Sequence, residues 1–243
     1  MNDLAREFWA LEKSLAEDLR KVDFADSKVK YILNPLEYCE EPHLQYLEKY
    51  LTGPKTVLFL GLNPGPWGMG QTGVPFGAVT PCQTFLNISG EVSSPACCPP
   101  KVKILGFNST RREVSGERFW GFVQSKWSTA ENFFENCFVQ NYCPLVLTTE
   151  TGRNITPAEL RSDCKAVVMS HCDSALVRSL ALLQTTQVVA IGRFVYDRVK
   201  KAVKQHDLKI SLSFLTHPSP ANPAANQGWA RAAELSLNKL NIF

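Results

Sequence analysis

Residues Thr56–Gly77 read TVLFLGLNPGPWGMGQTGVPFG, and the architecture of the chain follows from them. The first five residues, Thr56–Leu60, are an uncharged apolar run, which is typical of a strand buried on both faces of a parallel sheet. From Gly61 to Gly77, glycine and proline are too frequent for a helix or a second strand. Because ligands bind beyond the carboxyl ends of strands in open α/β sheets, we predict a binding loop here rather than an ordinary connection.

Three further apolar runs alternate with segments of helical spacing, and they lie at Phe138–Asn141, Gln187–Ile191 and Ile210–Leu215. Such alternation predicts an α/β fold, a three-layer sandwich whose central, mostly parallel four-stranded sheet is flanked by helices. With 243 residues and no linker, we expect a single domain over residues 1–243. Its one long irregular surface segment, partly mobile, is expected near residues 80–114.

Apolar spacing and capping residues predict the helices. Thr156 and Asn222 are expected N-caps because a proline follows each of them at the first helical position. The predicted helices cover residues 4–19, 42–51, 115–127, a segment beginning after Thr156, 175–183, 194–205 and 224–240.

Composition excludes several classes of protein. No apolar run approaches the roughly 18 residues of a membrane helix, and the first residues resemble no secretory signal, so we expect an intracellular protein without a membrane partner. The eight cysteines form no CxxC pair, which favours reduced thiols over an iron–sulfur cluster or zinc. We therefore expect no metal and no cofactor.

Net charge is only +3, but it is unevenly distributed. Residues 101–126 and residues 193–209 each contain four more basic than acidic side chains. This excess is compatible with contacts to a phosphate backbone, and equally with solvated helix faces.

Polar residues terminate three of the predicted strands. Asn63, Asn141 and His217 each follow an apolar run, and the carboxyl ends of parallel strands share one edge of a sheet. We therefore expect these three side chains to face one slot, together with Phe76 and a second proline-rich loop that begins at Pro218.

Five motifs occur in the same order as in a known family: GLNPGPWGMGQTGVPFG, VSGERFWGF, FVQNYCPL, GRNITPAEL and HPSPANPAANQGW. Together they closely resemble the single-strand-selective monofunctional uracil-DNA glycosylases, from about Leu33 to the end of the chain. The resemblance implies the uracil-DNA glycosylase fold and hydrolysis of the N-glycosidic bond of uracil in DNA. Uracil removal leaves an abasic site and initiates base excision repair.

The resemblance also assigns roles in the site. Asn63 would hold the attacking water, and His217 would donate to uracil O2, where negative charge develops. Phe76 would stack on the base, and Asn141 would pair with O4 and N3–H, which cytosine cannot match. The remaining substrate-binding residues are Leu62, through its main chain, and Gly65 and Met69, which leave room beside C5 for 5-hydroxymethyluracil.

DNA contacts follow from the same comparison, because a base in a duplex must be flipped out. The implied DNA-binding residues are Arg153, Asn154, Thr156, Ser219, Pro220, Ala221 and Asn222. Ala221 departs from the family, whose vertebrate members carry arginine there, which puts activity on duplex relative to single-stranded DNA in question. No lysine lies in either loop motif, so no lyase step is expected.

The partner implied is therefore DNA, single-stranded or duplex with a flipped base, acted on by a monomer in the nucleus. Two alternatives remain open. One is a catalytically silent nucleic-acid-binding module of the same fold, which the presence of Asn63 and His217 disfavours. The other is a branch of the superfamily with an iron–sulfur cluster or an aspartate that activates water.

Overall fold

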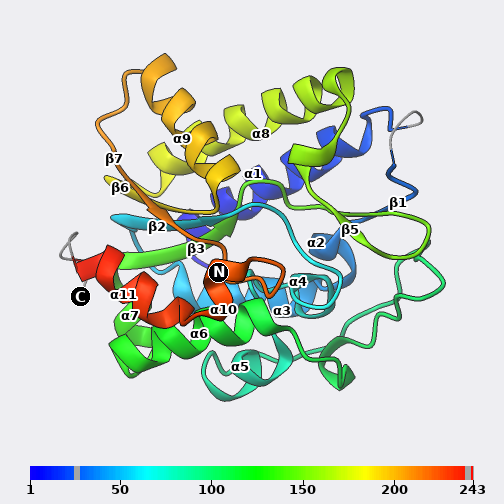
Figure 1. Cartoon of the computed structure of the whole chain (residues 1–243), viewed down its shortest axis with the longest axis horizontal. Coiled ribbons are helices and arrows are strands. Elements are labelled where there is room, and N and C mark those ends of the chain that lie inside the picture. Colours follow the sequence, from blue (N-terminus) through cyan, green and yellow to red (C-terminus); the bar gives the residue numbers. More distant parts are fainter. Residues whose placement is uncertain (25–27, 239–241, 243) are drawn as a thin grey trace.

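A computed structural model describes residues 1–24, 28–238 and 242. At its centre is a four-stranded sheet in which all neighbouring strands are parallel (Figure 1). In spatial order the strands are β3 (Cys137–Asn141), β2 (Val57–Gly61), β6 (Gln187–Ile191) and β7 (Ser211–Leu215). Each predicted strand is present, and the predicted α/β class is confirmed.

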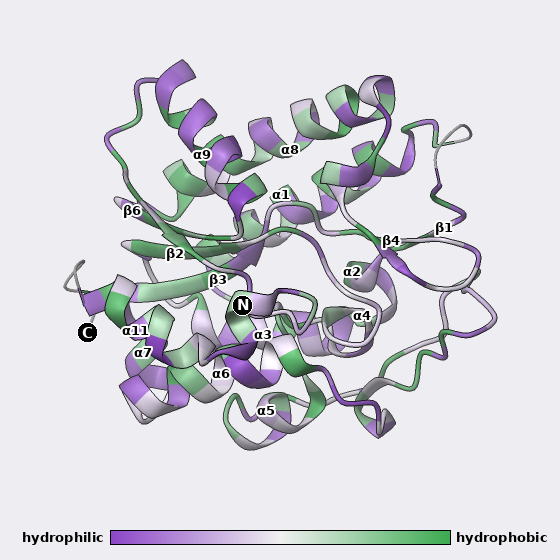
Figure 2. Cartoon of the chain, viewed as in Figure 1, coloured by the Kyte–Doolittle hydropathy of each residue, from purple (hydrophilic) through white to green (hydrophobic). Residues whose placement is uncertain are grey.

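The register of this sheet aligns its carboxyl ends. Gly61 is opposite Asn141, and Ile191 is opposite Leu215. Every residue of β2 and β3 is buried, as their uncharged sequences predict, and Figure 2 shows these strands as an apolar band inside the molecule. The residues that follow the strands are thereby brought to one edge of the sheet.

Helices cover both faces of the sheet, so the predicted three-layer sandwich is confirmed (Figure 1). One layer contains α1 (Asp3–Arg20), α8 (Ser162–Leu182) and α9 (Arg193–Gln205). The other contains α3 (Glu40–Tyr50), α5 (Val79–Thr84), α6 (Val114–Trp127), α7 (Ala130–Asn136) and α11 (Trp229–Asn238).

Aromatic side chains fill the space between this second layer and the sheet. Phe59 of β2 contacts Phe119 and Phe133 edge-on or tilted, with ring centroids 5.9 and 5.4 Å apart. Trp120 is fully buried, and its Nε1 donates to the carbonyl of Pro75, 3.2 Å away. Burial of each such side chain contributes about 1.5–3 kcal/mol, so the helical aromatic residues of α6 belong to the core.

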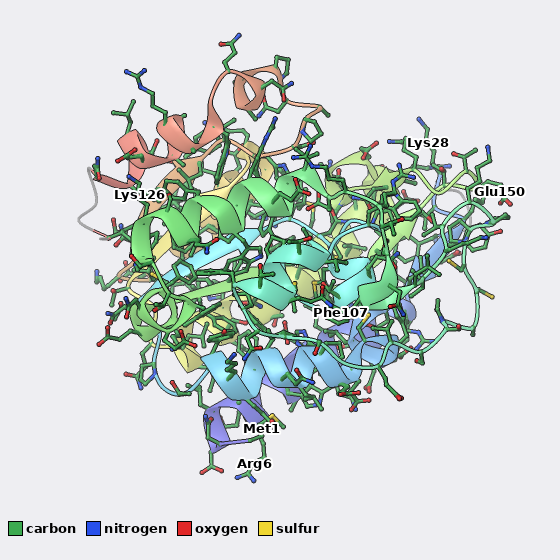
Figure 3. All side chains as sticks on the ribbon, turned by 90° about the horizontal axis from the view of Figure 1, so that it is seen from below. Met1, Arg6, Lys28, Phe107, Lys126 and Glu150 are labelled. Carbon is green, nitrogen blue, oxygen red and sulfur yellow. The ribbon has the colours of Figure 1, made fainter. Side chains whose placement is uncertain are left out.

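A second, antiparallel sheet was not predicted. It consists of β1 (Tyr31–Leu33), β4 (Val146–Thr148) and β5 (Asn154–Ile155). Lys28 and Glu150 mark its end of the molecule in Figure 3. The helix start predicted at Thr156 is confirmed, because Thr156 and Glu159 form a capping box around Pro157. The helix that starts there is the short 3₁₀ helix η2 (Pro157–Glu159), and the long helix α8 begins at Ser162.

The segment 80–114 contains α5 and the 3₁₀ helix η1 (Gly106–Asn108), with irregular backbone elsewhere. Leu86, Ile88 and Val102 are buried, and the Tyr50 hydroxyl donates to the carbonyl of Leu86 over 2.6 Å. Parts of the segment are thus packed into the molecule, Leu86 against α3 and Val102 beside Gly152, and the rest lies on the surface.

The single closing helix expected over residues 224–240 is divided. Asn222 caps α10 (Pro223–Asn226), and Gly228, with φ of +108°, separates it from α11. Few residues other than glycine adopt that conformation, so the break is encoded locally. Residues 239 and 240 lie outside the described residues. The remaining short helices are α2 (Pro35–Tyr38) and α4 (Met69–Thr72).

No helix among the described residues is long and apolar enough to cross a membrane.

Candidate active site

A cavity of about 640 Å³ opens at the carboxyl ends of the parallel strands. Residues at or just after the carboxyl ends of β2, β3, β6 and β7 contribute to its wall, and this edge is where an open α/β sheet binds ligands. The cavity brings together the predicted residues Leu62, Asn63, Gly65, Met69, Phe76, Asn141, Asn154, Thr156, His217, Ser219, Pro220, Ala221 and Asn222.

Asn63 is held by the unpredicted small sheet. Its Nδ2 donates to the carbonyl of Ile155 in β5 at 3.3 Å and to the carbonyl of Pro64 at 3.2 Å. With both amide hydrogens directed to main-chain carbonyls, the atom left to hold a water is Oδ1, which can only accept.

Asn141 lies at the end of β3, 8% exposed, with Nδ2 3.2 Å from the sulfur of Met69. A thioether is a weak acceptor, so the amide can exchange this contact for a better one. Gly61 makes the position possible, because a Cβ there would lie 2.5 Å from Asn141 Oδ1 and 3.0 Å from the Phe76 ring.

Phe76 forms an aromatic wall of the cavity. Its ring stacks on Phe119 of α6, with centroids 4.8 Å apart and planes at 22°, and lies 6.0 Å from the His217 ring. Its backbone has φ of +53°, which a phenylalanine rarely adopts. Such a conformation persists only where surrounding contacts enforce it, and it fixes the ring against α6.

His217 follows β7 and has a defined tautomer. The N–H of Ser219 donates to His217 Nδ1 over 3.1 Å, so in the neutral ring the proton is on Nε2. Burial lowers the pKa of His217 to about 4, because desolvation disfavours the imidazolium. Near neutral pH the side chain is therefore an uncharged donor through Nε2.

Comparison with known proteins agrees with this geometry. The family model described as the uracil DNA glycosylase superfamily matches residues 49–236. The single-strand selective monofunctional uracil DNA glycosylase of Bos taurus is 44% identical over 240 residues, covering 99% of this chain and 88% of that protein. Its Rattus norvegicus counterpart is 43% identical and covers 99% and 86%. The chain belongs to the single-strand selective monofunctional branch of the uracil DNA glycosylase superfamily.

A solved structure supports the fold of this glycosylase family member independently. The crystal structure of wild-type Pedobacter heparinus SMUG2 superposes with a TM-score of 0.66 and covers 95% of this chain and 98% of that chain. At 20% sequence identity, this likeness shows a shared fold.

Three arginines on the rim of the glycosylase cavity were not predicted individually. Arg111 stacks on Trp67, 4.0 Å from the ring centroid. Arg112 and Arg193 line the same rim, where they pair with Glu117 and Asp197. They belong to the two basic clusters of the sequence, residues 101–126 and 193–209, so the local excess of positive charge is the sequence feature that could have identified them.

Glu113 is the acidic residue of the cavity wall, and it caps α6 by accepting from the N–H groups of Ser115 and Gly116. Burial raises the pKa of Glu113, although these hydrogen bonds oppose the shift. Its carboxylate is thus committed to the helix terminus.

The predicted DNA-binding residue Arg153 is not brought to the cavity. Its guanidinium pairs with Glu159 at 2.7 Å. Asn154 does line the cavity, and its Oδ1 is buried without a hydrogen-bond partner within the described part of the chain. Buried acceptors are normally satisfied, so a donor on a ligand would be favourable there.

Proposed function

We propose that this cavity binds a uracil flipped out of DNA and hydrolyses its N-glycosidic bond, leaving an abasic site. As a member of its family the protein is a hydrolase that acts on N-glycosyl bonds of DNA. The observation that carries the assignment is the convergence of Asn63, Phe76, Asn141 and His217 on one cavity from the ends of three parallel strands.

Base selection rests on Asn141 and Phe76. Asn141 Oδ1 accepts from N3–H of uracil, and Nδ2 leaves the Met69 sulfur to donate to O4. Cytosine presents the reversed pattern, so its entry would leave buried polar groups unpaired, which disfavours it strongly. The Phe76 ring, backed by Phe119, stacks on the pyrimidine and contributes on the order of 1–3 kcal/mol.

Bond cleavage rests on Asn63 and His217. As the N–C1′ bond breaks, its electron pair leaves with uracil, and His217 Nε2–H stabilises the growing charge on O2. The uncharged imidazole can do this because its Nε2 already carries the hydrogen that it donates to O2. The water held by Asn63 Oδ1 then adds to the positively charged sugar at C1′, and its extra proton passes to bulk water.

The scope of the reaction is also proposed. A Cβ on Gly65 would meet nothing within 4 Å, so there is open space beside the base, and we extend the substrates to 5-hydroxymethyluracil. The enzyme acts on single-stranded and duplex DNA as a nuclear monomer in base excision repair, without a lyase step, since neither loop provides a lysine.

A single assay tests this function. The protein is incubated with EDTA and a single-stranded oligonucleotide bearing one uracil, followed by alkali to cleave abasic sites, with a cytosine oligonucleotide as the matched control. We expect cleavage at uracil alone. Intact uracil strands, bound by the protein, would instead identify a silent nucleic-acid-binding module.

A further inference from the structure

Arg118 of α6 contacts the loop that carries His217. Its Nη1 donates to the carbonyl of Pro218 at 2.9 Å, and its Nη2 donates to Asn226 Oδ1 at 2.9 Å. Asn226 Nδ2 in turn donates to the carbonyl of Pro220, also at 2.9 Å. One guanidinium thereby joins both ends of the loop between β7 and α11.

The Pro218 carbonyl belongs to the same peptide group as the Ser219 N–H, and that N–H donates to His217 Nδ1. The two ends of a trans peptide group point in opposite directions within one rigid plane. The guanidinium and the imidazole are therefore on opposite sides of a single peptide, each bonded to it.

We propose that Arg118 is a positioning residue for His217, acting through the Pro218–Ser219 peptide group. A cation on the carbonyl polarises the peptide and strengthens its N–H as a donor. The stronger donor keeps the proton off Nδ1 and on Nε2, the nitrogen that faces the substrate. The predicted effect on turnover rests on the proposed function. The predicted effect on the His217 tautomer does not depend on it.

The partners of Arg118 distinguish it from other arginines of the protein. Arg112, Arg153, Arg193 and Arg198 each pair with a carboxylate. Within residues 1–24, 28–238 and 242, Arg118 pairs with none, and both of its acceptors are neutral and lie in one loop. Its full charge is thus available to polarise the peptide.

The experiment compares Arg118→Met, Arg118→Lys and Asn226→Ala by nitrogen-15 NMR of the histidine rings, with single-turnover kinetics in parallel. The chain has four histidines, so a His217→Leu sample assigns the signal. Arg178→Met, which removes an exposed cation on α8, is the matched control.

We expect the wild-type His217 ring to carry its proton on Nε2. Arg118→Met should populate both tautomers and lower turnover roughly ten- to hundredfold with little change in KM. Arg118→Lys should retain part of the effect, and Asn226→Ala should leave the tautomer unchanged, because the contact to Pro218 remains.

Two results would overturn the proposal: a folded Arg118→Met protein with the wild-type tautomer and turnover, or an Asn226→Ala protein whose tautomer shifts as far as that of Arg118→Met. The second would mean that loop anchoring, rather than peptide polarisation, orients the ring. If Arg118→Met does not fold, Arg118→Gln, which keeps a donor but removes the charge, is measured in its place. A wild-type protein that does not excise uracil would contradict the proposed function, while the NMR comparison would still decide the role of Arg118.

Discussion

The two loops that form the cavity are built in different ways. In the loop after β2, residues 68–75 are all buried, and the hydroxyl of Tyr38 and the ring of His43 bond to its main chain. In the loop after β7, residues 220–228 are mostly exposed. That loop is held by a few side chains, chiefly Arg118 and Trp229, whose Nε1 donates to the carbonyl of Thr216 at 2.6 Å.

This difference predicts that the two loops respond differently to mutation. The loop after β2 is continuous with the core, so a change there should alter stability and activity together. The loop after β7 rests on polar contacts at the surface, so a change there should alter activity alone.

The largest effect is expected when the chemistry is removed from each loop. Asn63→Ala and His217→Leu should each lower single-turnover cleavage by roughly 10²–10³-fold, because each removes one preorganised polar group from a desolvated site. Fluorescence anisotropy with a uracil oligonucleotide should show that binding survives. Wild-type rates in either variant would mean that its assigned role is wrong.

The next largest effect is expected from mutating His43, whose ring bonds to the main chain of the loop after β2. The loss of stability should depend on pH. Its ring nitrogens lie 2.7 Å from the Gly73 carbonyl and 2.8 Å from a Glu12 carboxylate oxygen, and two acceptors favour the doubly protonated ring. Burial opposes this charge, but Glu12 and Gly73 raise the pKa of His43 above its ordinary 6.5.

A raised histidine pKa contributes stability that is complete below the unfolded value and is lost as pH rises through the folded one. His43→Gln should therefore lower the free energy of unfolding by about 3 kcal/mol at pH 6, with a smaller loss at alkaline pH. Urea melts at several pH values measure this, and His171→Gln, at a partly exposed histidine, is the control. A gap that widens as pH rises would contradict the assignment.

Gly61→Ala should have a smaller effect, and it tests whether recognition is built into the core. The added Cβ would meet Asn141 Oδ1 at 2.5 Å and displace the amide that we propose selects the base. We expect a loss of about 1–3 kcal/mol of stability together with weaker discrimination against cytosine. Gly53→Ala, where a Cβ meets nothing within 4 Å, is the matched control. If selectivity for uracil over cytosine did not change, Asn141 would not be the residue that selects the base.

Much of the fold could be predicted because its central strands are uncharged, largely apolar runs. In β2, β3 and β6 nearly every residue is buried, whereas in β7 only Leu215 is. The resemblance of the five motifs to the glycosylase family is confirmed by the family membership and agrees with this fold. The small sheet could not be predicted, since strands of two or three residues show no periodicity. That omission matters, because β5 provides the carbonyl that orients Asn63.

The site divides in the same way. Asn63, Asn141 and His217 could be predicted from their positions after apolar strands, and the structure places them on one cavity. The contact from Arg118 to Pro218 could not, because the two residues are 100 positions apart and a cation on a helix has the same sequence signature whether it meets solvent or a loop. Long-range polar contacts depend on loop paths that no local pattern encodes.

The smallest effect is expected at Ala221, an exposed residue of the cavity rim in the second loop. Ala221→Arg adds a cation at the position where the family resemblance implies arginine. It should raise kcat/KM on uracil in duplex DNA about threefold and steepen the dependence of binding on salt by about one counterion, with little change on single strands. Ala221→Gln, of similar polarity but uncharged, is the control.

Because the side chain projects from a surface loop, the melting temperature should not change. An equal gain on both substrates, or a gain with glutamine, would mean that the loop after β7 contributes to binding through shape and not through charge.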